Sequence, residues 1–411
     1  MTIENATKKT ALDAITVIDL SRILAGPWAS QTLADLGAQV IKVERPKIGD
    51  DTRTWGPPFI KQATETEPAQ AAYFHCANRN KKSIAIDITS KRGQQLIKDM
   101  VTKADVFIEN YKVDGLAKYG LDYQTLKQLN PSLVYCSITG FGQTGPYANK
   151  PGYDAMIQGE GGLMSITGEP NGSPMKAGVA LIDVMTGLYS SNAILAALMA
   201  RQHTKMGQYI DISLLDVQVA ALANQAMNYL TTGENPSRLG NEHPNIVPYQ
   251  TFATQDGSLI LAIGNDTQFA SFCQLCQCKE LSDDKKYSTN KYRVKNRNSL
   301  IPIIAEKIAR QPTRWWIEQL EKVSVPCGPV NTLKEVFEHP QIKHREMVKH
   351  IPDINNDNIS VVASPINLSA TPVQYNSASP DLGQHSYQIL NDFLNVDDEV
   401  ITQLFDEGVV S

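Results

Sequence analysis

The sequence predicts an α/β fold: a parallel sheet covered by helices on both faces, followed by a second, smaller domain. Through the first half of the chain, short runs rich in Val and Ile alternate with longer helical patterns. These runs are almost continuously apolar, as strands buried on both faces of a parallel sheet are. From Thr251 the pattern changes to a strand, a Gln-Asp-Gly turn and a strand, followed by helices, which indicates the smaller domain.

The expected elements of the first half follow one another without long gaps. The strand-like runs are 14–20, 39–44, 82–87, 105–110 and 133–141. The helical patterns between and after them are 27–37, 90–104 and 123–130. A further strand near 207–213 continues into one long apolar helix that reaches residue 230. Because open parallel sheets bind ligands beyond the carboxyl ends of their strands, the loops that follow these runs are the candidate site.

The same patterns predict domain boundaries. We expect a large domain over 1–213, a linker over 214–240 that becomes rich in turn-forming residues from Thr231, and a small domain over 241–325. Residues 326–411 are expected to be a second linker and a return to the large domain.

Composition excludes several classes of protein. The chain has 411 residues, of which 42% are hydrophobic and 20% charged, and its net charge is −5. This balance gives no electrostatic footprint for nucleic acid or an anionic membrane as a partner. Six cysteines in so long a chain do not form a disulfide framework. The N-terminus lacks an apolar signal core, and no run of about 20 apolar residues is present, so a cytoplasmic location is expected.

Short motifs do not name a reaction. The Gly26-Pro27 helix start can attract a phosphate, but it is also an ordinary helix beginning. Basic residues that follow the expected strands could bind a polyphosphate or form a solvated charged rim; they are Lys42, Arg45, Lys47, Arg53, Arg79, Lys81 and Lys82. The triplet Cys273, Cys276 and Cys278 has no second Cys or His pair at zinc-site spacing, so no metal site is expected. The absence of a G-x-G-x-x-G fingerprint argues against a nicotinamide oxidoreductase.

One acidic residue allows two interpretations. Asp183 stands in "GVALIDVMTGLYSSNAILAAL" between a β-like run and a helix of small and apolar residues. It can be a helix cap, typically worth about 1 kcal/mol, or a carboxylate nucleophile that the helix start keeps ionised. Gly187 in the first turns costs roughly 1 kcal/mol against alanine, which indicates a close approach to the backbone. Residue chemistry alone leaves both roles open.

Six motifs in order resemble the family III CoA-transferases (CaiB/BaiF type) over about residues 14–410. They are "DLSRILAGPWASQTLADLGAQVIKVERPKIGDDTR", "NRNKKSIAIDI", "ADVFIENY", "GFGQTGPYANKPGYDAMIQGEGGLMSITGEP", "GVALIDVMTGLYSSNAILAALMAR" and "VPCGPVNTLKEVFEHPQ". The resemblance implies a Rossmann-like large domain that binds coenzyme A and carries catalysis, a smaller α+β domain, and an interlocked homodimer. It places the catalytic carboxylate at Asp183. The coenzyme A contacts that it implies are Ile23, Leu24, Ala25, Arg45, Asn110, Tyr111 and Lys118.

The resemblance also implies a chemistry. An acyl-CoA donor and a small carboxylic acid exchange CoA through an aspartyl anhydride and an aspartyl-CoA thioester, with no metal or redox cofactor and with coenzyme A as a substrate. The segment 238–269 is similar to succinyl-CoA:glutarate CoA-transferases, which implies succinyl-CoA as donor and a dicarboxylate such as glutarate or itaconate as acceptor. Candidate substrate-pocket residues are Tyr153, Arg238 and His243.

Two alternatives stay open at this point. The 2-methylacyl-CoA racemases of the same family have a histidine where Tyr153 stands, and a phenol with a pKa of about 10 is a poor proton acceptor. A non-catalytic CoA-binding protein would keep the coenzyme A contacts and would not need Asp183.

Overall fold

The computed structural model describes residues 10–60, 70–353 and 358–411. The chain divides into two compact units. Unit 1 comprises Met1–Gly162, Ala177–Ala223 and Lys343–Ser411, and unit 2 comprises Leu163–Lys176 and Asn224–Ile342. The division differs from the expected domains, because residues 163–176, expected within the large domain, belong to unit 2. The expected linker 214–240 is divided between the units at Ala223, and residues 326–342 belong to unit 2.

Unit 1 is built on a six-stranded, fully parallel sheet with the order β3-β2-β1-β4-β5-β6. Its strands are β1 Thr16–Asp19, β2 Gln39–Glu44, β3 Lys81–Ala85, β4 Val106–Glu109, β5 Val134–Thr139 and β6 Tyr209–Ser213. This is the strand order of dinucleotide-binding sheets, in which ligands bind where the order reverses. Here the reversal falls between β1 and β4, so the loops after these two strands frame the expected site. The predicted α/β class with a parallel sheet is confirmed.

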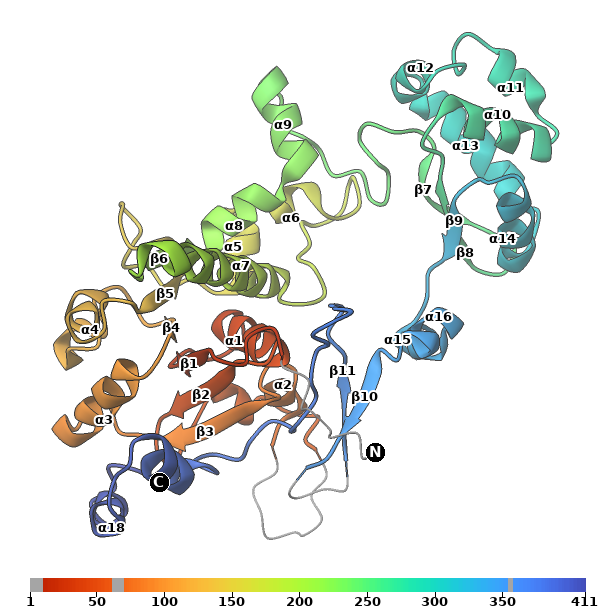
Figure 1. The fold of residues 1–411 in the computed structure, drawn as a ribbon. Helices are drawn as coiled ribbons and strands as arrows, with labels where there is room; N and C mark the ends of the chain where they lie inside the picture. The colour runs from red at the N-terminus through yellow and green to blue at the C-terminus, as the bar shows by residue number, and fades with distance from the viewer. Residues whose placement is uncertain (1–9, 61–69, 354–357) are drawn as a thin grey trace. The chain divides into compact units, whose positions relative to one another are not determined.

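Helices cover both faces of this sheet (Figure 1). On one face lie α1 (Ala25–Asp35) and α7 (Leu181–Thr204), which pack against each other. On the other lie α3 (Lys91–Thr102), α4 (Tyr123–Leu129) and, from the end of the chain, α18 (Asp398–Asp406). The last residues complete this layer, because Val410 bridges to Ile86 beside β3.

Shorter elements connect the layers of unit 1. They are the one-turn helices η1 Asp51–Arg53, α2 Ala72–His75 and η2 Ala117–Tyr119, the helices α5 Asp154–Glu160 and α8 Leu214–Ala221, the hairpin of β10 Val348–Ile351 and β11 Ile359–Val362, and α17 Ser386–Gln388 with η3 Ile389–Phe393. The prediction of a single long helix after β6 is wrong. The chain breaks between α8 and α9 (Ala223–Thr232), because Ala223 has a positive φ of 46°.

Among the described residues, α7 alone is long and apolar enough to cross a membrane by length and composition. Its side chains Ile182, Ile194, Ala197 and Leu198 are instead buried in the hydrophobic core beneath α1. The place of α7 in the core of unit 1 therefore explains the apolar side chains on its buried face, while Leu188, Tyr189 and Met199 remain exposed.

Unit 2 has its own core. An antiparallel sheet of β7 (Tyr249–Ala253), β8 (Ser258–Ala262) and β9 (Cys327–Pro329) packs against helices. These are α10 Asp266–Leu275, α11 Lys279–Asp283, α12 Asn290–Lys295, α13 Arg297–Ile308 and α14 Thr313–Lys322. Also in or at the edges of this unit lie α6 Leu163–Ile166, α9, α15 Leu333–Glu338 and α16 Pro340–His344. The strand, turn and strand expected after residue 250 are β7 and β8.

Candidate active site

A cavity of about 480 Å³ opens in unit 1 at the point where the strand order reverses. Its wall brings together eight of the eleven predicted site residues from three connecting segments and one long helix: Ile23, Leu24 and Ala25 after β1, Asn110, Tyr111 and Lys118 after β4, Tyr153 before α5, and Asp183 in α7. The other three lie elsewhere. Residues up to 160 positions apart in the sequence thus lie together beyond the carboxyl ends of the strands.

Asp183 is not the cap of α7. The helix begins at Leu181, so Asp183 is its third residue. The residues directly before the helix form no strand, and Ala180 at the cap position has no polar side chain. The cap comes from Asp154 at the start of α5. The Oδ2 atom of Asp154 accepts hydrogen bonds from the amide of Ile182 at 2.8 Å and from the amide of Asp183 at 3.2 Å. Asp154 thereby satisfies amides that a helix start leaves without partners.

Asp154 is held in turn by Gln158, whose side chain is fully buried. The Nε2 atom of Gln158 donates to Oδ1 of Asp154 at 2.6 Å, and its Oε1 atom accepts from the amide of Ala177 at 2.8 Å. The two side chains of α5 therefore fix the chain on both sides of the turn into α7. Neither Asp154 nor Gln158 was predicted as a site residue from the sequence.

The electrostatics of Asp183 also differ from expectation. Burial, together with the nearby Asp154 carboxylate, raises the pKa of Asp183 to about 7. The expectation that the helix start keeps this carboxylate strongly ionised is therefore wrong, because desolvation and like-charge repulsion outweigh the helix dipole here. A partly desolvated carboxylate that titrates near neutrality is typical of functional sites.

Gly187 serves helix packing rather than substrate access. A Cβ atom at this position would lie 2.8 Å from the carbonyl oxygen of Ala25 and 2.8 Å from Cβ of Trp28, both in α1. The glycine therefore allows α7 to approach α1 closely, and this helix contact is the close approach to the backbone that the glycine indicated.

Replacing Gly187 with Ala is expected to lower the free energy of unfolding by about 1–3 kcal/mol, the usual cost of overpacking. The measurement is urea unfolding monitored by circular dichroism. Gly178→Ala is the matched control, because a Cβ there meets no atom within 4 Å. If Gly187→Ala were as stable as the control, α1 and α7 would have to be less tightly packed than described.

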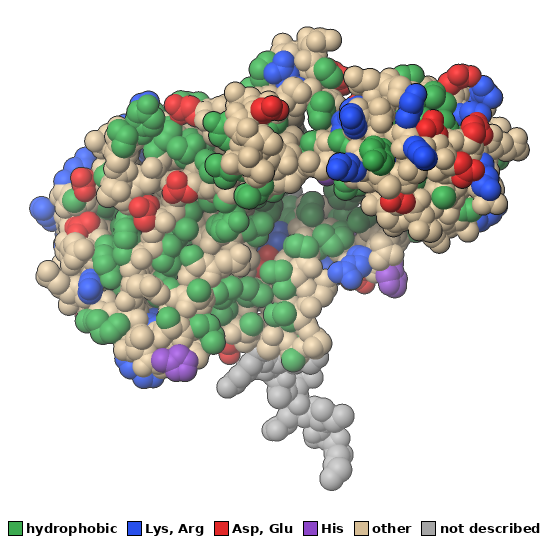
Figure 2. Space-filling model, turned by 90° about the horizontal axis from the view of Figure 1, so that it is seen from above, with side chains coloured by type: hydrophobic (Ala, Val, Ile, Leu, Met, Phe, Trp, Pro, Cys, Tyr) green, Lys and Arg blue, Asp and Glu red, His purple; other side chains and the backbone are tan. Residues whose placement is uncertain are grey.

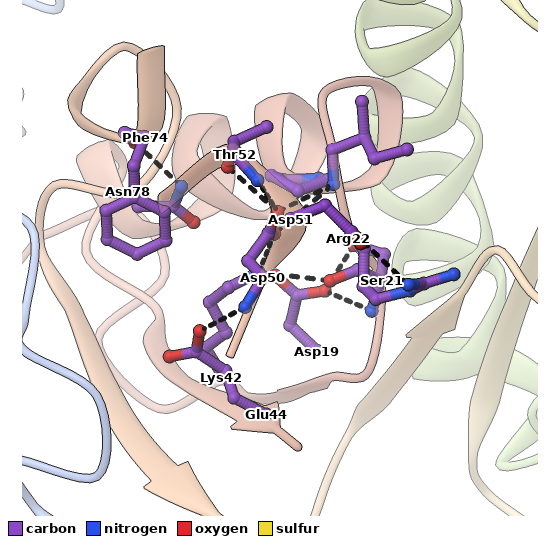
Figure 3. Close-up of polar contacts among 12 residues, drawn as sticks. Asp19, Ser21, Arg22, Lys42, Glu44, Asp50, Asp51, Thr52, Phe74 and Asn78 are labelled. Atoms are coloured by element: carbon purple, nitrogen blue, oxygen red, sulfur yellow. Dashed lines mark hydrogen bonds and ion pairs between the residues drawn. The ribbon is translucent and has the colours of Figure 1, made fainter. Parts of the chain in front are cut away.

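The turn after β1 has an unusual backbone. Ile23 has a positive φ of 72°, which a β-branched residue adopts only at a cost of order 1–3 kcal/mol. The preceding Arg22 is held by Asn110, whose Oδ1 atom accepts from the Arg22 amide at 2.9 Å and whose Nδ2 atom donates to its carbonyl at 2.7 Å. The Arg22 guanidinium pairs with Asp51 at 2.6 Å (Figure 3). The ends of β1 and β4 are thus joined at the cavity wall.

Most of the cations considered for polyphosphate binding are neither binding groups nor a solvated rim. Four of them are buried in ion pairs within unit 1: Lys42 with Asp50, Arg53 with Glu44, Arg79 with Asp35, and Lys81 with Asp19. The phosphate-binding interpretation is wrong for these four.

Arg45 and Lys118 remain accessible. Arg45 is exposed and lines a second cavity of about 260 Å³, to which Tyr111 and Tyr119 also belong. Lys118 lines the first cavity, and its Nζ atom lies 4.7 Å from the centre of the Tyr119 ring. Since Tyr111 lines both cavities, the two are neighbours along the β4 loop.

Arg238 and His243 belong to unit 2, whereas Asp183 belongs to unit 1. Arg238 donates from Nη2 to the carbonyl of Gly172 at 2.8 Å and from Nε to that of Glu169 at 3.3 Å. The Nδ1 atom of His243 accepts from the amide of Asn245 at 3.1 Å. Both side chains therefore support loops of unit 2.

The three clustered cysteines also lie in unit 2. Cys273 is in α10, while Cys276 and Cys278 follow its end. Across the described ranges, no group of three or more His, Cys, Asp or Glu side chains has an arrangement suited to a metal ion.

The sequence as a whole matches the model of CoA-transferase family III over residues 12–386. The chain belongs to this family. Among curated relatives, succinate–glutarate CoA-transferase of Agrobacterium fabrum is 51% identical and covers 93% of this chain and 96% of its own length. Succinyl-CoA:glutarate CoA-transferase of Homo sapiens is 43% identical, with coverages of 97% and 90%. A crystal structure of a CaiB/BaiF family protein from Brucella suis is 50% identical, with a TM-score of 0.82 and coverages of 93% and 99%.

These similarities confirm the family resemblance that the motifs indicated. Membership makes the protein an enzyme of the CoA-transferase class, which acts on acyl-CoA and carboxylic acid substrates. The cavity at the reversal of the sheet is accordingly the candidate active site.

Proposed function

We propose that this family III CoA-transferase transfers CoA from succinyl-CoA to a dicarboxylic acid such as glutarate or itaconate. The observation that carries the proposal is the placement of Asp183 in the cavity where the sheet order reverses, beside the predicted coenzyme A contacts. The substrates are supported by the relatives, two of which are named for succinate or succinyl-CoA and glutarate.

Asp183 acts as the nucleophile. One of its carboxylate oxygens attacks the thioester carbonyl of succinyl-CoA, the C–S bond breaks, and CoA leaves as a thiolate with an Asp183–succinyl anhydride behind. The thiolate attacks the Asp183 carbonyl carbon and releases succinate, which leaves an aspartyl-CoA thioester. The acceptor carboxylate then attacks the carbonyl carbon of the aspartyl-CoA thioester, which expels the CoA thiolate and leaves an anhydride between Asp183 and the acceptor. The thiolate attacks the acceptor carbonyl of this anhydride, which forms the new CoA thioester and frees Asp183. Each step exchanges one activated acyl bond for another, and the chemistry uses no metal or redox cofactor.

Coenzyme A lies along the loops after β1 and β4. Ile23, Leu24, Ala25, Asn110 and Tyr111 line its site, and Lys118 and exposed Arg45 supply positive charge for its phosphates. Tyr153 lies beside the acyl group.

The enzyme works as an interlocked homodimer in the cytoplasm. Support for a partner comes from large hydrophobic side chains that are exposed in α7, α8 and α9: Leu188, Tyr189, Met199, Val219, Met227, Tyr229 and Leu230. Hydrophobic side chains are also spread over the surface of unit 1 in Figure 2. Exposed large hydrophobic side chains on α7 and α8, which pack against each other, are typical of a protein interface.

Because Asp183 must be ionised to attack, kcat/KM is expected to rise with pH through an apparent pKa of about 7 and to level off above it. The measurement is the initial rate of transfer from succinyl-CoA to glutarate across pH 5.5–9. A profile that is flat or falls over this range would contradict a nucleophile that is protonated below neutrality.

The substrates are tested by incubating the full chain with succinyl-CoA and, separately, glutarate, itaconate, oxalate and acetate. We expect new CoA thioesters of the dicarboxylates by liquid chromatography and mass spectrometry, with acetate as the poor acceptor. Transfer to none of the dicarboxylates would reject the proposed acceptor class. Deuterium exchange at the α-carbon of a 2-methylacyl-CoA without transfer would instead support a racemase.

A further inference from the structure

The strained turn at Ile23 rests on a buried ion pair that has no role in the proposed chemistry. Asp50 and Lys42 are 1% and 0% exposed, and Nζ of Lys42 lies 2.9 Å from Oδ2 of Asp50. The amide of Ile23 donates to both carboxylate oxygens of Asp50, at 3.2 Å each. The pair therefore contacts the backbone at the one residue of the cavity wall that has a left-handed conformation.

Both members of the pair hold this turn. Besides Asp50, Lys42 donates to the carbonyl of Ser21 at 3.0 Å, two residues before Ile23. Asp50 is itself fixed by Thr52, whose amide and hydroxyl donate to its Oδ1 atom at 3.0 and 2.8 Å. Figure 3 shows Asp50 and Lys42 directed toward each other beneath the turn. Burial by itself would raise the pKa of Asp50, but the charge of Lys42 and the hydrogen bonds from Lys42 and Thr52 outweigh it and lower this pKa to about 2.

The turn carries three consecutive residues of the cavity wall. Ile23, Leu24 and Ala25 all line the cavity, and α1 begins at Ala25. If Ile23 relaxed to a negative φ, the backbone after it would change direction and Leu24 and Ala25 would leave their present places. We propose that the buried Lys42–Asp50 pair is a positioning device that keeps Ile23 left-handed and so preorganises this wall for coenzyme A. The inference rests on the proposed function, which assigns this wall to coenzyme A.

Substitution of Ile23 by glycine provides a specific test, because glycine adopts a positive φ without the steric penalty of a side chain. Asp50→Asn is made in three backgrounds: the unaltered chain, Ile23→Gly and Ile23→Ala. The two background changes remove nearly the same side chain, but only glycine removes the need to hold the turn. Binding of free coenzyme A is measured by isothermal titration calorimetry, so the readout is independent of transfer.

In the unaltered chain and in Ile23→Ala, Asp50→Asn is expected to raise the Kd for coenzyme A about 10-fold, the size that a strain penalty of this kind gives. In Ile23→Gly the same change is expected to raise it less than about 3-fold. Equal effects in the glycine and alanine backgrounds would overturn the inference, as would unchanged binding in Asp50→Asn.

A matched variant distinguishes a loss of coenzyme A binding from a general loss of stability. Asp35→Asn removes the carboxylate of another buried ion pair, with Arg79, at the last residue of α1. It is expected to lower the unfolding midpoint as Asp50→Asn does, and to leave the Kd for coenzyme A within about 2-fold. A similar rise of Kd in both variants would overturn the positioning role. If these differences in Kd are observed but no dicarboxylate accepts CoA, the proposed substrates are rejected and the positioning role of the ion pair stands. If the unaltered chain binds no coenzyme A, the proposed function and the positioning role are both rejected.

Discussion

Replacing Asp183 with Asn is expected to lower kcat for transfer from succinyl-CoA to glutarate by at least about 10³-fold, the usual scale for loss of a covalent nucleophile. An amide cannot form the anhydride, and no other carboxylate of the described residues stands in the same cavity wall. The measurement is the initial rate at pH 8, where the unaltered carboxylate is ionised, given its pKa of about 7.

Two controls show whether such a loss is chemical. The Kd for free coenzyme A should stay within about 2-fold, since Asn has nearly the shape of Asp. Stability at pH 8 should be equal or higher. The pKa of Asp183 is raised above its usual 3.8 to about 7, so its favourable contribution is present below about pH 4 and is lost as pH rises through 7. An Asp183→Asn enzyme that retains full transfer would exclude the nucleophilic role.

Asp154 should give the second largest effect, and its two variants should differ in kind. In Asp154→Ala the amides of Ile182 and Asp183 lose their acceptor, and kcat is expected to fall about 100-fold, as a displaced reacting group does. In Asp154→Asn a side-chain oxygen still accepts from these amides while the negative charge beside Asp183 disappears. The pKa of Asp183 is then expected to fall, because like-charge repulsion is one of the two causes of its rise.

The measurement for Asp154 is the pH dependence of kcat/KM for both variants. For Asp154→Asn the acid limb should move to lower pH, with relatively more activity retained at pH 6. The control variant is Gln158→Met, which keeps the side-chain volume and loses the hydrogen bonds to Asp154 and Ala177. Gln158→Glu is not suitable, because it adds a buried charge. An acid limb at the same pH in Asp154→Asn as in the unaltered enzyme would show that Asp154 does not act on the charge of Asp183.

The parallel sheet could be predicted because its strands are recorded in local composition. Runs such as 39–44 and 105–110 are rich in Val, Ile and Phe, and the structure forms β2 and β4 at the same places. The break between α8 and α9 could not be predicted in this way. It depends on a positive φ at Ala223, and alanine is otherwise a strong helix former.

The predicted site was found largely through motif resemblance, and the contacts that organise it could not be read locally. The amides of Ile182 and Asp183 are capped by a residue 28 and 29 positions earlier. Arg79 and Asp35 are 44 residues apart, and each in isolation looks like a surface charge. Ile23 gives no sign of a left-handed backbone, because Gly or Asn is the residue expected there. Such features arise from tertiary pairing, which composition and spacing do not encode.

The central claim is that Asp183 forms a covalent bond to the acyl group and then to CoA. The full chain is mixed with succinyl-CoA in the absence of acceptor and trapped with hydroxylamine, and the modified peptide is located by tandem mass spectrometry. We expect a hydroxamate at Asp183 that requires succinyl-CoA and is absent from Asp183→Asn. Continued transfer with no modification at Asp183, or with the label on another residue, would contradict the account.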